Sequence, residues 1–135
     1  MTDIQENKIL EFRSVARNLL FVAVAIILFL MKRQYAGPFQ ELVQSYAGNV
    51  TVSFALYFVF LRMCMMLPRF GRLIAAALVL VCVESFELLD GFGFMSNTYD
   101  SFDLLANAIG VGFALSLDVM MSRNRSQIPE AKADH

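Results

Sequence analysis

The chain has 135 residues, of which 58% are hydrophobic, and its formal net charge at neutral pH is −1. An ordinary soluble domain is about 45–50% apolar, and a soluble chain this short buries too little surface to hide the excess. The composition therefore predicts a single integral membrane domain, and the lack of net positive charge argues against a nucleic-acid partner.

Four apolar segments follow a charged N-terminal segment, residues 1–14, which we expect to lie in the cytoplasm. The apolar segments are residues 15–31, 51–67, 73–89 and 102–121. A helix needs about 20 residues to cross the hydrocarbon core, with a range of roughly 17–25, and none of the segments alternates as a barrel strand does. The sequence therefore predicts an all-α fold, an antiparallel bundle of four transmembrane helices spanning residues 15–121. The polar residues 122–135 are expected to form a disordered cytoplasmic tail.

The basic residues predict the orientation of this bundle. With four crossings, both termini and the loop near residues 68–72 share one side of the membrane. Of the 11 Lys and Arg residues in the chain, only Lys32 and Arg33 lie on the other side. Basic residues concentrate on the cytoplasmic side of membrane proteins, so both termini are expected in the cytoplasm. The segment between the first two crossings, which includes 39–46 as a possible short surface helix, is expected outside.

Acidic and amide side chains gather where the third and fourth segments approach the outer surface. Glu84 and Glu87 are three residues apart and share one face of the third helix. Asp103 and Asn107 are four residues apart on the fourth helix, and Asp100 lies in the loop before it. Antiparallel neighbours joined by a short loop bring these residues to a shared depth, where Asn107 is able to donate a hydrogen bond to a carboxylate. They are the predicted polar site.

Two interpretations of this predicted site stay open. In one, the side chains only hold two helices together. In the other, they bind a lipid headgroup, a cation or a cationic ligand, because ionisable residues within a membrane are costly and commonly functional.

Gly110 and Gly112 are expected to let another helix approach closely. Asp118, at the inner end of the fourth helix, is expected to form a structural ion pair with arginines of that side.

Catalysis is not favoured by the sequence. Motifs such as HExxH or a phosphate-binding loop are lacking, so we assign no catalytic residue and no cofactor. The metal-binding capacity of the acids is left undetermined. An enzyme acting on a lipid-linked substrate, with paired acids for general acid–base chemistry, remains a third alternative.

Two short motifs in the second half of the chain carry a family resemblance. The first is the stretch from Glu84 to Glu87, which reads Glu-Ser-Phe-Glu late in one helix. The second runs from Asp100 to Gly110 and reads Asp-x-x-Asp-x-x-x-Asn-x-x-Gly. The pair of motifs resembles the VanZ-like membrane proteins and a related uncharacterised family of small bacterial membrane proteins. The first motif departs from the family pattern, which has Gln where this chain has Glu87, and the family's loop arginine is missing between residues 91 and 101.

The resemblance implies a four-helix, multi-pass protein of the bacterial inner membrane, with a role at the cell envelope. The acidic loop suits a cationic ligand better than an anion. The favoured function is therefore a non-enzymatic protein that binds a lipid headgroup, a cation or a cationic amphiphile at the outer leaflet. A structural or accessory subunit of a larger membrane complex is the alternative. The expected partners are the lipid bilayer, a lipid-linked or cationic ligand, and other membrane subunits.

Overall fold

The computed structural model describes residues 3–67, 70–90 and 100–125. In these ranges the chain is helical and contains no strand, which confirms the predicted all-α fold. The elements are α1 (Asp3–Met31), the short 3-10 helix η1 (Lys32–Gln34), α2 (Gln40–Cys64), α3 (Gly71–Asp90) and α4 (Ser101–Arg125).

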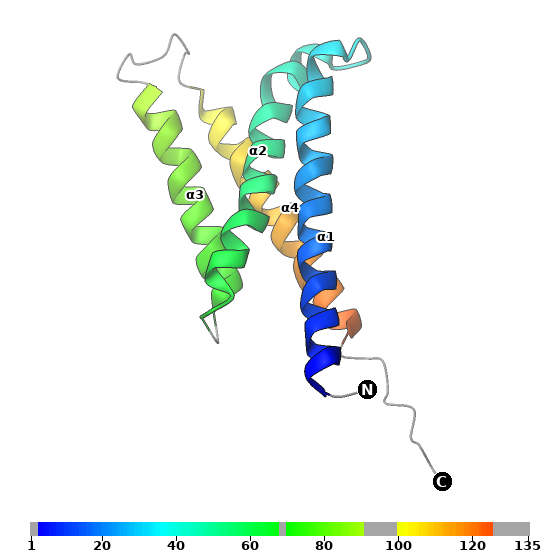
Figure 1. The fold of residues 1–135 in the computed structure, drawn as a ribbon. Coiled ribbons are helices and arrows are strands. Elements are labelled where there is room, and N and C mark those ends of the chain that lie inside the picture. The colour runs from blue at the N-terminus through cyan, green and yellow to red at the C-terminus, as the bar shows by residue number, and fades with distance from the viewer. Residues whose placement is uncertain (1–2, 68–69, 91–99, 126–135) are drawn as a thin grey trace.

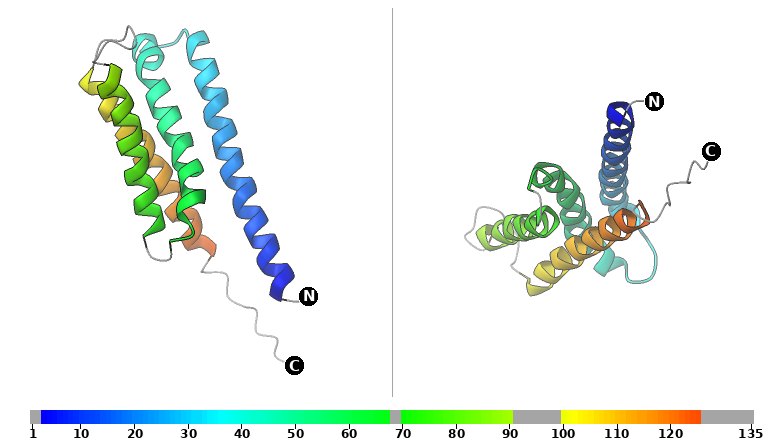
Figure 2. Two further views of the ribbon diagram at one scale, coloured as in Figure 1. Left: turned by 60° about the vertical axis from the view of Figure 1, so that its left-hand side comes forward. Right: turned by 90° about the horizontal axis from the view of Figure 1, so that it is seen from below.

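Successive helices run in opposite directions, as Figures 1 and 2 show. The start of α1 and the end of α4 lie at one end of the bundle, here called the terminal end. The end of α1, the start of α2, the end of α3 and the start of α4 lie at the opposite end, here called the distal end. Helix α2 is central, because it packs against each of the other three helices. Among the described residues, α2 is the only long helix whose backbone lies in close contact with α1.

Within the described ranges, three helical stretches are long and apolar enough to cross a membrane, Ile4–Gln34, Gln40–Cys64 and Ser101–Arg123. Their large apolar side chains are widely exposed; examples on α1 are Leu19, Ile27 and Leu30. Such apolar surfaces are favourable in contact with lipid and unfavourable in contact with water. The fold is therefore that of a multi-pass membrane protein. Helix α3 has 20 residues but carries charges near both ends, and its composition alone does not identify it as a span.

The helices extend beyond the apolar segments seen in the sequence. Helix α1 includes residues 3–14, and α2 begins at Gln40, so the stretch 39–46 forms the first turns of α2 and is not a separate surface helix. Residues 122–125, expected in a disordered tail, continue α4, while 126–135 lie outside the described residues. Hydropathy predicts only the part of a helix that lies in the hydrocarbon core of the membrane. Polar residues with good helix propensity, such as Glu, Lys and Gln, continue the same helix into water.

The contact between α2 and α4 is the most extensive in the bundle and positions the polar residues described below. A Cβ atom at Gly110 would overlap the Val50 carbonyl and the Ser53 hydroxyl of α2. Only hydrogen therefore fits at residue 110, and the two backbones approach directly. Gly112 is exposed, and a Cβ atom there would meet nothing within 4 Å. The close-packing role expected of Gly112 is not seen, because two residues turn a helix by about 200° and carry it to the opposite face.

Candidate functional site

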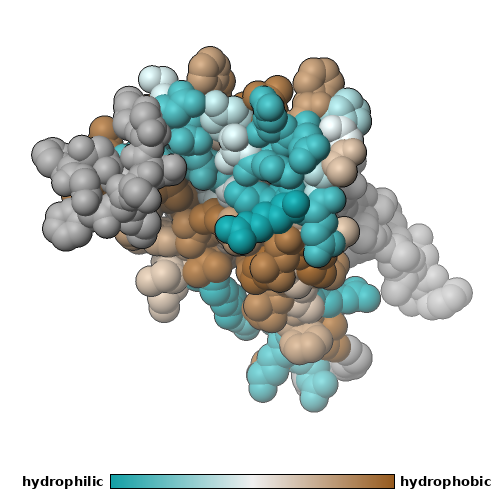
Figure 3. Space-filling view, turned by 90° about the horizontal axis from the view of Figure 1, so that it is seen from above, coloured by the Kyte–Doolittle hydropathy of each residue, from teal (hydrophilic) through white to brown (hydrophobic). Residues whose placement is uncertain are grey.

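The polar site at the distal end joins α4 to α2. The Tyr46 hydroxyl donates a hydrogen bond to Asp100 Oδ2 at 2.7 Å, and the Asn49 amide donates to Asp103 Oδ1 at 2.7 Å. Both donors are neutral groups from the first turns of α2. Asp100 and Asp103 together are called the distal acidic pair. Hydrophilic residues gather across this end of the molecule, as the view onto it in Figure 3 shows.

Asp100 is also the N-terminal cap of α4. Its Oδ1 accepts a hydrogen bond from the backbone N–H of Phe102 at 3.1 Å, and its carbonyl accepts one from the N–H of Asp103 at 3.0 Å. Capping by Asp satisfies donors that the first turn of a helix leaves unpaired. The Phe102 N–H, followed by the Tyr46 hydroxyl, holds the pKa of Asp100 below its usual range. The carboxyl group is therefore ionised at neutral pH.

Two buried polar atoms without partners lie on α3 and α4. Asn107 is 2% exposed, and its amide nitrogen Nδ2 has no hydrogen-bond partner; the Oε2 atom of Glu84 is also buried and unpartnered. The hydrogen bond expected from Asn107 to a carboxylate across α3 and α4 is consequently not formed. An unpaired buried polar atom costs about 1–3 kcal/mol, so a ligand or water that bonded to these atoms would stabilise the protein.

The structure separates the five predicted site residues into two groups. Asp100 and Asp103 have bonding partners on α2, and Asn107 lies one turn further along α4. Glu84 and Glu87 are half-buried on α3, and the hydrogen bonds seen for the distal acidic pair do not come from that helix. The reason is the tight packing at Gly110, which turns the polar face of α4 towards α2.

Tyr46, Asn49 and Lys32 were not among the residues predicted for the site. The spacing of Tyr46 and Asn49, three residues apart and followed by Ser53, does mark one polar face of α2, and this was the signal available. The Lys32 amine lies against Gly48, the residue before Asn49, and over the Phe29 ring at 5.1 Å from its centre. A cation is therefore present at the same end of the bundle as the distal acidic pair.

An apolar groove begins beside the acids. It has a volume of about 390 Å³ and is lined from both α2 and α4, by residues that include Tyr46, Val50, Phe102, Leu105 and Ile109. The ring of Tyr46 also contacts that of Phe102, with the ring centres 6.0 Å apart. Tyr46 thus belongs to both surfaces: its hydroxyl bonds to Asp100 and its ring lines the groove.

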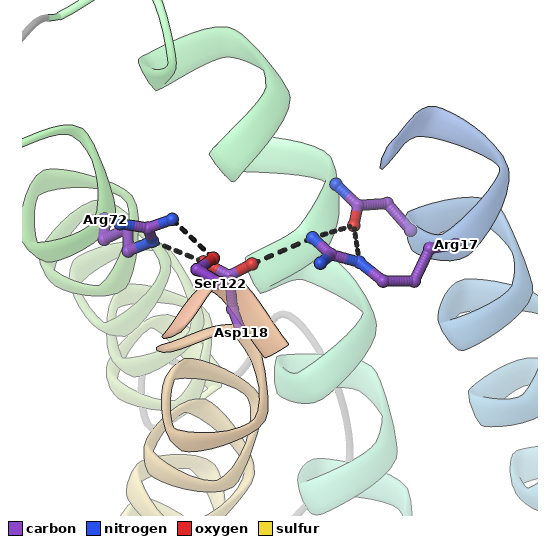
Figure 4. Close-up of polar contacts among 5 residues, drawn as sticks. Arg17, Arg72, Asp118 and Ser122 are labelled. Atoms are coloured by element: carbon purple, nitrogen blue, oxygen red, sulfur yellow. Dashed lines mark hydrogen bonds and ion pairs between the residues drawn. The ribbon is translucent and has the colours of Figure 1, made fainter. Parts of the chain in front are cut away.

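A second polar cluster occupies the terminal end (Figure 4). Asp118 of α4 is 1% exposed and pairs with two arginines, Arg17 Nη2 at 2.9 Å and Arg72 Nε at 2.6 Å. Arg17 also donates to the Asn18 side chain, and Arg72 donates to the Ser122 hydroxyl. The ion pair expected for Asp118 is confirmed. Arg17, Arg72 and Asp118, the terminal cluster, link α1, α3 and α4.

Neither metal chemistry nor relatives define this site further. Among the described residues, no group of three or more His, Cys, Asp or Glu side chains is arranged to hold a metal ion. No protein-family model matches the chain, and no curated protein or solved structure matches it.

Proposed function

We propose that this chain is a four-span membrane protein that binds a cationic amphiphile, such as a lipid with an amine headgroup, at its distal end. The observation that carries the proposal is the position of Tyr46, which joins an ionised carboxylate to an apolar groove. A molecule with a positive head and an apolar tail matches both surfaces at once. Such sites combine an apolar lining with a few placed polar groups.

The fourth span in this proposal is α3. Helix α3 lies antiparallel to α2 and packs against both α2 and α4. Its 20 residues extend about 30 Å at 1.5 Å per residue, which matches the hydrocarbon thickness. The charged residues fall near its ends, where Arg72 already has Asp118 as a partner. A helix that packs against two spans, and is itself long enough to cross, is expected to cross with them.

The orientation in the proposal follows from the basic residues of the described helices. Lys32 and Arg33 lie at the distal end, whereas Lys8, Arg13, Arg17, Arg62 and Arg72 lie in the terminal half. The excess of positive charge supports a cytoplasmic terminal end and an outward distal end. The resemblance of residues 84–87 and 100–110 to motifs of VanZ-like proteins supports an envelope role in a bacterial inner membrane.

The charge of the distal acidic pair favours a cation. Among the described residues, Asp100 and Asp103 form no ion pair, and the hydrogen bonds they accept come from neutral donors. Neutral donors orient a carboxylate without cancelling its charge. An ammonium group supplies the missing positive charge and up to three N–H donors. Lys32 nearby suits the phosphate of the same headgroup, since a lipid amine commonly accompanies a phosphate.

The proposal is tested with the purified full-length chain in detergent, using dodecylamine as the probe and dodecyl maltoside, with the same alkyl chain, as the uncharged reference. Dodecylamine is expected to raise the unfolding temperature of the wild-type protein. The double variant Asp100→Asn/Asp103→Asn should weaken dodecylamine binding by about fivefold, as expected for loss of two partly exposed charge pairs. Glu41→Gln removes an exposed acid at the same end of α2 and serves as the matched control. Equal binding by all three proteins would contradict the proposal.

A further inference from the structure

The pocket at the terminal end carries more positive than negative charge. Asp118 contributes one carboxylate, and this single group is shared by the guanidinium groups of Arg17 and Arg72. The side chain of Arg17 is only 12% exposed, so water screens its charge poorly. A partly desolvated cation without its own counter-ion is unfavourable. The terminal cluster is therefore short of one negative charge.

A cavity adjoins the cluster. Its volume is about 130 Å³, well above the roughly 10–15 Å³ that one water needs. All four helices contribute to its wall, and the polar groups facing it are Ser14, Arg17, Asn18, Arg62, Arg72 and Ser122, with Asp118. Guanidinium and hydroxyl groups are donors suited to phosphate oxygens. The lining thus offers three guanidinium groups to an anion, and the carboxylates that pair with them are Asp118 in the lining and the exposed Glu11 on Arg62.

An apolar groove between α1 and α2 lies next to the cavity. This groove has a volume of about 350 Å³ and is lined by residues that include Leu19, Val22, Phe58 and Val59. Val15, Asn18 and Arg62 line both spaces. A phosphate in the cavity therefore places any acyl chain attached to it directly in the groove.

We infer that the terminal end binds an anionic phospholipid, with the headgroup phosphate among Arg17, Arg62 and Arg72 and an acyl chain between α1 and α2. Basic pockets between membrane helices are a known way to hold phosphate headgroups. The position of the cavity beside the apolar groove favours a lipid over free phosphate. The inference does not depend on the distal site, because the two sites share no residue and require ligands of opposite charge.

The test uses the full-length protein in detergent, with phosphatidylglycerol as the probe and inorganic phosphate and phosphatidylethanolamine as references. Native mass spectrometry measures the retained lipid. Wild-type protein is expected to retain phosphatidylglycerol. Arg62→Gln should lower its affinity by about fivefold, the factor equivalent to roughly 1 kcal/mol for one basic residue. The ion pair of Arg62 with Glu11 is exposed on both sides, so the variant is expected to fold. Arg33→Gln, which removes an exposed cation at the distal end, is the charge-matched control and should bind as wild type does.

Asp118→Asn is expected to change the affinity for phosphatidylglycerol in the opposite direction from Arg62→Gln. It removes the carboxylate that competes with the lipid for Arg17 and Arg72, so it should tighten phosphatidylglycerol binding. Added phosphatidylglycerol should then restore more stability to this variant than to wild type. If Arg62→Gln and Arg33→Gln bind the lipid equally, or if Asp118→Asn is not stabilised by it, the inference is wrong. An equal effect of inorganic phosphate would overturn the assignment to a lipid.

Discussion

Asp118 is the residue on which the terminal end depends most. It lies almost fully buried between arginines of α1 and α3, and its ion pair with Arg17 links α1 to α4. Removing one member of a buried ion pair leaves an uncompensated charge, which costs more than the pair contributes. The cluster therefore specifies how α1, α3 and α4 are placed relative to one another.

Asp118→Ala is expected to lower the free energy of unfolding by about 3 kcal/mol, the lower end of the range for a broken buried pair, because Arg72 is partly exposed. Equilibrium unfolding in detergent measures this change. Glu11→Gln breaks the exposed pair with Arg62 and should change stability by less than about 1 kcal/mol. Similar losses for the two variants would show that the terminal cluster is not a structural link.

Tyr46 is predicted to contribute, after the backbone N–H of Phe102, to the lowered pKa of Asp100. The folded-state pKa of Asp100 is lowered, so its contribution to stability is present above the unfolded pKa and is lost as pH falls through the folded pKa. Tyr46→Phe removes one of the two hydrogen bonds that lower this pKa and should move it back towards about 3.9. Carbon-13 NMR titration of the Asp100 carboxyl group measures the shift. An unchanged pKa would mean that the Tyr46 hydroxyl does not bond to Asp100 in solution.

At the residue scale, the sequence singled out acids at the distal end but not the groups of α2 that bond to them. Intramembrane Asp103 and Asn107 stand out because polar residues are costly there. Tyr46 and Asn49 do not, because interfacial tyrosines and residues near helix ends are common. Their role becomes visible only in the tertiary structure, where α2 packs against α4. This packing depends on the small size of Gly110.

At the element scale, the contact between α2 and α4 depends on that glycine. A methyl group at residue 110 would meet a backbone carbonyl and a side chain that is itself held in place, since the Ser53 hydroxyl bonds to the Asn49 carbonyl at 2.6 Å. Backbone atoms yield less readily than the end of a flexible side chain. The two helices must therefore separate if a larger residue is introduced.

Gly110→Ala is expected to destabilise the protein by about 1–3 kcal/mol, as overpacking of a close contact does. The matched control is Gly112→Ala, two residues along the same helix, where space is open. Alanine there should be neutral or stabilise by up to about 1 kcal/mol, because it favours the helix. Thermal unfolding of both variants in detergent makes the comparison. A reversed order of stability would contradict the observed crossing of α2 and α4.

The sequence predicted the number and order of the helices but not their ends. Apolar runs indicate which residues are suited to the hydrocarbon core, and each of the four runs lies inside or overlaps an observed helix. The polar first part of α1 and the early start of α2 were missed, because propensity and tertiary contact extend helices beyond the membrane signal. Hydropathy likewise locates α3, but hydropathy alone does not identify this helix as a span. The proposal that α3 crosses the membrane depends on its packing against α2 and α4.

At the scale of the whole molecule, the proposed topology places both ends of the described chain in the cytoplasm. Cysteine reporters test it in a background where Cys64 and Cys82 are replaced by alanine. In intact cells, a membrane-impermeant maleimide should label Arg33→Cys at the distal end and leave Lys8→Cys unlabelled. Labelling of Lys8→Cys becomes possible once the membrane is permeabilised. The opposite pattern would invert the topology and with it the outward position of the distal acidic pair.

The whole bundle thus presents two polar ends of different charge, each beside an apolar groove: acids at the distal end and arginines at the terminal end. This arrangement predicts that lipids with different headgroups occupy different ends of the same protein. Long-range attraction at exposed charges is screened by salt, so the preference should weaken as ionic strength rises.

Photo-crosslinking in a mixed bilayer is the most direct measurement of binding at the distal end. Crosslinkable phosphatidylethanolamine and phosphatidylglycerol analogues with the same acyl chains are compared, and labelled peptides are identified by mass spectrometry. The ethanolamine lipid should label residues 40–50 and 100–110 more strongly than the glycerol lipid, and this preference should disappear in Asp100→Asn/Asp103→Asn. Equal labelling of these peptides by both lipids, unchanged in the double variant, would contradict the proposed binding of an amine headgroup.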